Sequence, residues 1–159
     1  MRQISMPQKD VFLLLDVRKK IAYLKKKYRT TNPFELADMI GIVVITEDLG
    51  AIDGYYNKQL RQKQIHINCN LSENDMLFTC AHELGHALLH QNSNTKFLYE
   101  NTLLSVDKLE QEANKFAMEL LLPDDLLLEY SNCSIEQMSR LFGYSEKLIE
   151  LRLKLSVKL

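Results

Sequence analysis

The segment that most constrains this chain is 82–86, in which Glu-Leu-Gly separates two histidines. A spacing of four places His82 and His86 one turn apart on the same face of an α-helix, where both can bind one metal ion. Glu83 lies about 100° round the helix from His82, close enough to hold an attacking water without binding the metal. The segment therefore requires a helix and predicts a zinc site with Glu83 as catalytic base.

The helix that carries this segment is expected to run from Ser72 to about His90. Ser72 and Asp75 resemble a capping box in which the shorter acid replaces Glu. The histidines should face a cleft rather than the core, because they lie opposite an apolar stripe of Leu77, Ala81, Leu84 and Leu88. Gly85 costs such a helix roughly 1 kcal/mol relative to Ala, which a close approach of neighbouring backbone would explain.

A catalytic zinc site needs a third protein ligand and an open position. His90 lies eight residues beyond His82, about 12 Å along the helix axis, whereas ligands of one ion lie within roughly 4 Å of each other. We therefore expect His90 to line the cleft or to support a ligand. An acid from another element has to complete the set.

That acid is sought on a second helix, predicted from about Val106 to Leu121 and stopped by Pro123. Glu112 lies at the edge of the apolar stripe of this helix, and Glu119 lies on the same edge two turns later. Glu110 is expected to point well away. Helical geometry therefore favours Glu112, with Glu119 in reserve.

The composition indicates one globular domain, with 159 residues of which 46% are hydrophobic and 26% charged. A net charge of −1 argues against a general DNA-binding role. The first apolar run, 11–15, is too short for a signal-peptide core or a membrane span. The three cysteines form no CxxC pair, which fits free thiols in a reducing compartment. We expect a cytoplasmic protein.

The order of predicted elements favours an α+β fold with a small antiparallel sheet. A helix over 11–28 and a short helix over 33–40, capped by Asn32, precede the sheet. Short helices capped at Ser134 and Ser145 end the chain. The three strands are predicted at 42–45, 54–56 and 64–68, with 57–63 as a hairpin connection.

Two segments resemble the ImmA/IrrE family of metallopeptidases: residues 82–90, and residues 110–117 with Leu-Leu-Pro at 121–123. The Ile-x-Ile-Asn stretch at 65–68 and the helix that starts at Asn32 also fit, so the resemblance covers roughly residues 30 to 150. It implies a zincin-like fold, in which His82, His86 and Glu112 bind zinc and Glu83 is catalytic. The whole chain, 1–159, would then be one metallopeptidase domain, with an N-terminal helix (1–30), a zincin-like core (31–125) and C-terminal helices (126–159).

The resemblance also implies a function, the cleavage of a helix-turn-helix repressor that relieves repression in a phage or mobile element. The chain has no room for a fused DNA-binding or sensor domain, so we expect it to meet the repressor as a separate protein. Related zinc peptidases often place an Asp four residues after the glutamate ligand, to orient a histidine. Counted from Glu112, that position is Phe116, so Asn114 or Asp75 would have to serve.

The sequence offers several candidates for substrate binding. Strand 64–68 could hold an extended peptide by adding one more strand to the sheet. His66 on this strand faces away from the core, where a solvated histidine is the simpler interpretation. Segment 91–105 is either a lid or recognition segment or an inert surface loop. Hydroxyl donors for the transition state could come from Tyr55, Tyr56, Tyr99 or Tyr144.

Two other functions are consistent with parts of the sequence. A non-catalytic protein could bind the repressor and use zinc only for structure, but three ligands beside a glutamate argue for an open catalytic site. Residues 134–145 resemble part of a helix-turn-helix. Glu146 and Glu150 oppose the basic residues Lys147 and Arg152 of the following helix, so packing or a protein contact is the better interpretation than DNA binding.

Overall fold

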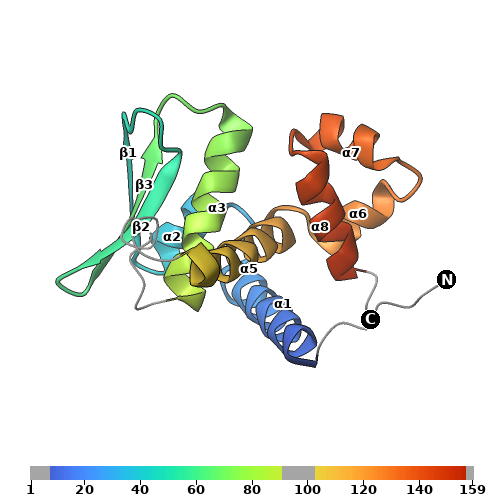
Figure 1. The fold of residues 1–159 in the computed structure, drawn as a ribbon, viewed down its shortest axis with the longest axis horizontal. Helices are drawn as coiled ribbons and strands as arrows, with labels where there is room; N and C mark the ends of the chain where they lie inside the picture. Colours follow the sequence, from blue (N-terminus) through green and yellow to red (C-terminus); the bar gives the residue numbers. More distant parts are fainter. Residues whose placement is uncertain (1–7, 91–102, 157–159) are drawn as a thin grey trace.

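The computed structural model describes residues 8–90 and 103–156 and confirms the α+β class. The strands are β1 (Val43–Glu47), β2 (Gly54–Gln59) and β3 (Gln62–Asn68). In Figure 1, α3 lies between this sheet and α5, and the C-terminal helices gather on the far side of α5. The helices are α1 (Gln8–Tyr28), α2 (Pro33–Met39), α3 (Glu73–Leu89), α5 (Leu103–Leu121), α6 (Asp124–Glu129), α7 (Ile135–Phe142) and α8 (Glu146–Ser156).

The sheet is mixed, so the expectation of a purely antiparallel sheet is wrong. Its strand order is β1-β3-β2, with β1 parallel to β3 and β2 antiparallel to β3. The connection 48–53 therefore carries the chain past β3 to the other edge of the sheet. The buried side chain of Asn68 holds this connection, because its amide donates to the carbonyls of Gly50 and Ile52 at 3.0 Å. Turn residues in a sequence indicate which neighbouring strands form a hairpin. They do not indicate a parallel pairing such as that of β1 with β3.

The β2–β3 hairpin turns at Leu60 and Arg61, so most of the predicted connection 57–63 is strand. Both residues have positive φ, 47° and 69°, as a two-residue turn of type I′ requires. Gly and Asn are the usual residues in such a turn, and neither is present. This absence explains why the sequence did not place the turn.

The predicted N-caps at Asn32, Ser72 and Ser134 are confirmed, whereas α1 and α5 each begin three residues before the predicted start. The side chain of Asn32 accepts from the backbone of Phe34 at the start of α2, and Ser72 accepts from Asp75 at the start of α3. Ser134 and Gln137 form a complete capping box on α7. These are local interactions, and residue type and spacing are sufficient to predict them.

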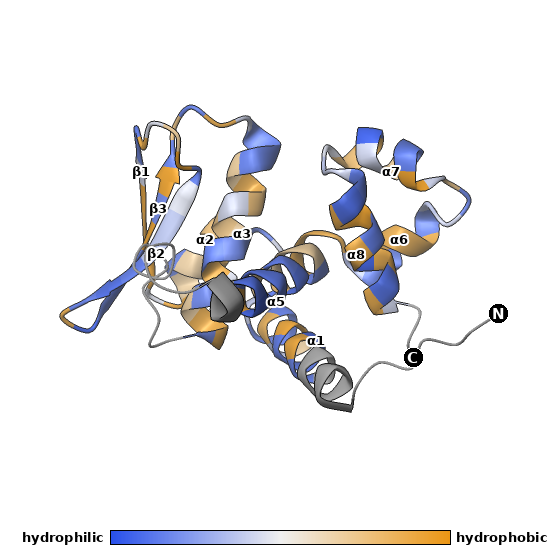
Figure 2. Cartoon of the chain, in the orientation of Figure 1, coloured by the Kyte–Doolittle hydropathy of each residue, from blue (hydrophilic) through white to orange (hydrophobic). Residues whose placement is uncertain are grey.

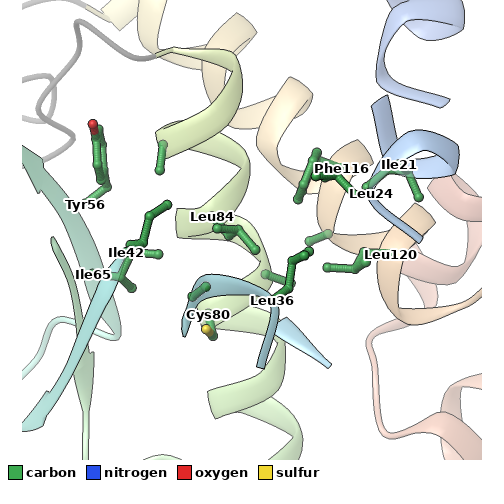
Figure 3. Packing of buried hydrophobic residues seen from close by; sticks show 14 of the residues in the cluster. Ile21, Leu24, Leu36, Ile42, Tyr56, Ile65, Cys80, Leu84, Phe116 and Leu120 are labelled. Atoms are coloured by element: carbon green, nitrogen blue, oxygen red, sulfur yellow. The ribbon is translucent and has the colours of Figure 1, made fainter. Parts of the chain in front are cut away.

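The main core lies where α3 meets the sheet on one side and α1, α2 and α5 on the other. Figure 3 shows Ile65 from the sheet, Leu84 from α3 and Phe116 from α5 within one continuous cluster. A second cluster, with Met118, Met138 and Ile149, lies under the C-terminal helices. In Figure 2 apolar and polar residues alternate along most helices, as expected of helices that pack one face on a core. Within the described ranges, no helix is both long and apolar enough to cross a membrane.

The close contact between α3 and α5 depends on Gly85. A Cβ atom at this position would lie 3.2 Å from the Cα of Ala113 and 3.2 Å from the Cβ of Phe116. This confirms the expected approach of neighbouring backbone. The contact brings the two histidines of α3 against α5.

Gly85→Val should lower the stability of the fold. Its branched side chain would overlap with backbone and with a core residue that has no room to move, at a cost of about 2–3 kcal/mol. For a chain of this length we expect a melting temperature lower by roughly 5–10 °C. Gly85→Ala should lose less, because Ala regains about 1 kcal/mol of helix propensity. Calorimetry would test this, and a valine variant as stable as the wild type would contradict the close approach.

Candidate metal centre

The two histidines of α3 meet at their Nε2 atoms, which lie 3.2 Å apart. His82 lies at the wall of a cavity, whereas His86 is fully buried between α3 and α5. The expectation that both rings face a cleft therefore holds for His82 alone. Two ring nitrogens this close need a cation or a proton between them, because two lone pairs would otherwise repel each other.

Glu110 on α5 supplies the carboxylate beside this pair. Its Oε2 lies 3.0 Å from Nε2 of His82, and its Oε1 lies 3.1 Å from Nε2 of His86. Within the described part of the chain, His82, His86 and Glu110 form the set whose ligand atoms all lie within 4.8 Å of one another.

The expectation that Glu112 occupies this place is wrong. Glu110 and Glu112 lie about 160° apart on the helix, one at each edge of the apolar stripe of α5. Glu110 therefore does not point away from α3, and the stripe alone does not select one edge. The packing of α5 across α3 places the Glu110 edge over the histidine pair.

The other two acids have different partners. The Oε2 of Glu112 lies 2.7 Å from Nε2 of His90. Glu119, the reserve candidate, is buried and forms ion pairs with Arg18 at 3.0 Å and Arg152 at 3.4 Å. It thereby joins α1, α5 and α8 and does not belong to the set formed by His82, His86 and Glu110.

Asn114 orients His82. Its Oδ1 lies 2.8 Å from Nδ1 of His82, and since an amide oxygen can only accept, this ring nitrogen carries the proton. The lone pair of His82 is then on Nε2, facing Glu110. Asn114 stands four residues after Glu110. Related zinc peptidases often place an Asp at this distance from their glutamate ligand, so the expected spacing is present from Glu110, with Asn in place of Asp. Asp75, the other candidate, accepts from Ser72 at 2.6 Å.

The electrostatics favour positive charge at this point. Burial of His82 acts to lower its pKa, but the hydrogen bond with Glu110 and the charge of Glu83 outweigh burial, so the pKa of His82 is raised. Burial lowers the pKa of His86, helped by its neighbour His82. Burial would raise the pKa of Glu110, but its hydrogen bonds with both rings hold that pKa at about 2. Glu110 is therefore a carboxylate at neutral pH, as a metal ligand must be.

A cavity of about 580 Å³ opens beside the histidine pair. Glu83 lines it next to His82 and Glu110 and is 2% exposed. Two imidazole nitrogens and a carboxylate are a donor set that zinc prefers, and the cavity beside them would provide the open position that a catalytic zinc ion needs. The residues present thus fit a zinc ion.

The remaining candidates divide between the cavity and the core. Tyr55 lines the cavity, and its ring stacks on His66 with centroids 4.5 Å apart and planes 8° apart. His66 faces away from the core as expected and pairs through Nδ1 with Glu47 at 2.5 Å. Tyr56, predicted as a possible hydroxyl donor, is instead fully buried in the core and does not line this cavity.

Tyr144 and Tyr99 were the other candidate hydroxyl donors. Tyr144 packs in the second apolar cluster under the C-terminal helices. Tyr99 lies outside the described residues, as does most of the proposed lid 91–105.

The substrate edge predicted at 64–68 is wrong, because β3 is the central strand and pairs on both sides. The strand that lines the cavity is β2, through Gly54 and Tyr55. The sequence also did not identify the apolar wall made by Ile52 and Phe78. One signal for the missed carboxylate was available in the sequence, because Glu110 and Asn114 repeat the spacing of four residues found in the histidine pair.

The α+β fold carries, at the wall of a cavity, a His-His-Glu set that could hold a metal ion, and this combination is typical of metal-dependent enzymes. The pattern of the IrrE N-terminal-like domain, a peptidase family, matches residues 37–154. An immunity region protein of Bacillus phage phi105 is 45% identical over 139 residues, which are 86% of this chain and 88% of that protein. The metallopeptidase ImmA of Bacillus subtilis (strain 168) is 37% identical over 115 residues, which are 71% of this chain and 67% of ImmA.

The chain belongs to the ImmA/IrrE family of metallopeptidases. A solved structure with a similar fold, a Mycobacterium tuberculosis transcriptional regulator, superposes with a TM-score of 0.57 at 16% identity. That similarity covers 89% of this chain but 46% of the regulator, and it concerns the fold alone.

Proposed function

We propose that this chain is a zinc-dependent endopeptidase of zincin-like fold that cleaves a helix-turn-helix repressor and thereby relieves repression in a phage or mobile element. The observation that carries the proposal is the convergence of two imidazole nitrogens and the Glu110 carboxylate beside Glu83, at the wall of a cavity. The names of the relatives, a metallopeptidase and a phage immunity region protein, support both the chemistry and the setting.

His82, His86 and Glu110 would hold the metal in this proposal. When bound, zinc would polarise the scissile carbonyl and make a water molecule acidic enough to attack it near neutral pH. Glu83 accepts the proton of the attacking water and later delivers it to the leaving amine. Asn114 holds the ring of His82 in the tautomer that this arrangement needs.

The outer edge of β2 is the proposed binding site for the peptide. Of the strands in the described sheet, β2 is the edge strand that reaches the cavity, and an extended peptide could pair with it as an additional strand. Ile52 and Phe78 would then accept an apolar side chain of the substrate. Tyr55, held by its stack on His66, lies at the same wall and is a candidate donor to the carbonyl under attack.

The proposal also concerns the organisation of the chain and its location. We assign residues 1–159 to one metallopeptidase domain, because the main cluster joins α1 to the sheet and α5 packs on both α1 and α8. A repressor acts on DNA, so the proposed site of action is the bacterial cytoplasm.

The test is to incubate the purified chain with the repressor encoded beside it, with and without a strong zinc chelator. We expect the intact repressor to disappear and two fragments to appear without chelator, and the reaction to stop with chelator and resume when zinc is restored. Electrophoresis and mass spectrometry of the fragments would give the cleaved bond. An intact repressor in a stable complex under both conditions would instead favour a non-catalytic binding protein.

A further inference from the structure

A hydrogen-bonded relay of side chains, from Glu112 to His86, reaches the candidate metal centre through His90, the residue at the C-terminal end of α3. Its backbone N–H donates to the carbonyl of His86 at 2.9 Å, and its ring lies beside that residue. Nδ1 of His90 is 3.1 Å from Nδ1 of His86, and Nε2 of His90 is 2.7 Å from Oε2 of Glu112. The side chains of His90 and Glu112 are only 7% and 8% exposed.

The contacts within this relay determine which ring nitrogen of His90 and of His86 carries a proton. The carboxylate of Glu112 can only accept, so Nε2 of His90 donates to it. In a neutral ring this leaves Nδ1 of His90 with a lone pair, which accepts from Nδ1–H of His86. The remaining lone pair of His86 is then on Nε2, the atom that lies 3.1 Å from Glu110. The opposite assignment would place a proton on Nε2 of His86 and block that atom as a ligand.

We propose that His90 and Glu112 are positioning residues, which hold His86 in the tautomer and orientation needed to bind the metal. This inference rests on the proposed zinc site. The two ligand histidines are thus supported differently, His82 by a neutral amide and His86 by a second imidazole backed by a carboxylate. Glu112 acts on the metal centre through two intervening rings.

Loss of such a supporting partner typically weakens metal affinity 10–100-fold. We therefore expect His90→Leu to bind zinc 10–100-fold more weakly than the wild type, measured by competition with a chromophoric chelator. His90→Asn should recover part of this loss, because Oδ1 of Asn stands where Nδ1 of His stood and can accept from His86. Leu89→Ala is the matched control, since it shortens a packed side chain at the same helix end without touching the relay. It should lower thermal stability and leave zinc affinity unchanged.

Nitrogen-15 NMR of the zinc-loaded wild type gives a second readout that does not depend on any variant. We expect the ring proton of His90 on Nε2 and that of His86 on Nδ1. Equal zinc affinity of the wild type and His90→Leu would overturn the inference and leave the proposed function intact. A proton on Nδ1 of His90 with none on Nε2 would also overturn the inference. Failure of the wild type to bind zinc would overturn the proposed function together with the inference.

Discussion

Glu83→Gln should reduce the rate of repressor cleavage by about 10²–10⁴-fold while leaving zinc affinity within a few-fold of the wild type. The amide has nearly the shape of the carboxylate, so the buried side chain should still fit beside the cavity. It cannot take a proton from the attacking water, and a positioned base typically contributes a factor of this size. Single-turnover cleavage assays and zinc titrations on the same preparation would measure both quantities.

Glu73→Gln is the matched control for this variant. It makes the same change on the same helix, at an exposed residue of the first turn of α3. Its cleavage rate should equal that of the wild type. Normal cleavage by Glu83→Gln would remove Glu83 from the mechanism, and loss of zinc from that variant would assign it to metal binding instead.

Glu110→Gln should weaken zinc binding by on the order of 100-fold. Apparent binding free energies of zinc sites with four ligands are about 10–16 kcal/mol, so one ligand contributes on the order of 3 kcal/mol. A neutral amide is a poor ligand for zinc and also removes the negative charge that faces both rings. Competition with a chelator of known affinity would give the ratio of dissociation constants.

Glu112→Gln is the comparison that separates the two acids. It retains an oxygen that accepts from His90, so zinc affinity should fall by less than about tenfold. A larger loss in Glu112→Gln than in Glu110→Gln would show that the carboxylate at 112 reaches the metal, as the apolar stripe of α5 suggested. The pair also tests the packing of α5 on α3, because both variants lie on one helix and differ in the edge they occupy.

Several features of this protein follow from residue type and local spacing alone. The spacing of His82 and His86 and the caps at Asn32, Ser72 and Ser134 depend on neighbours within a turn or two of helix. Such features follow from residue type and from a period of 3.6 residues. The sequence alone was therefore sufficient to place the helix that carries His82 and His86 and the side of it on which they lie.

Tertiary packing decided what lies opposite that helix. Glu110 and Glu112 occupy equivalent edges of one apolar stripe, and the crossing of α5 over α3 brings the first to the ligand pair and the second to His90. The position of β3 between its neighbours likewise depends on a connection that passes from one sheet edge to the other. Both outcomes come from contacts between residues far apart in the chain, whose free energies depend on how whole elements fit together and not on any local pattern.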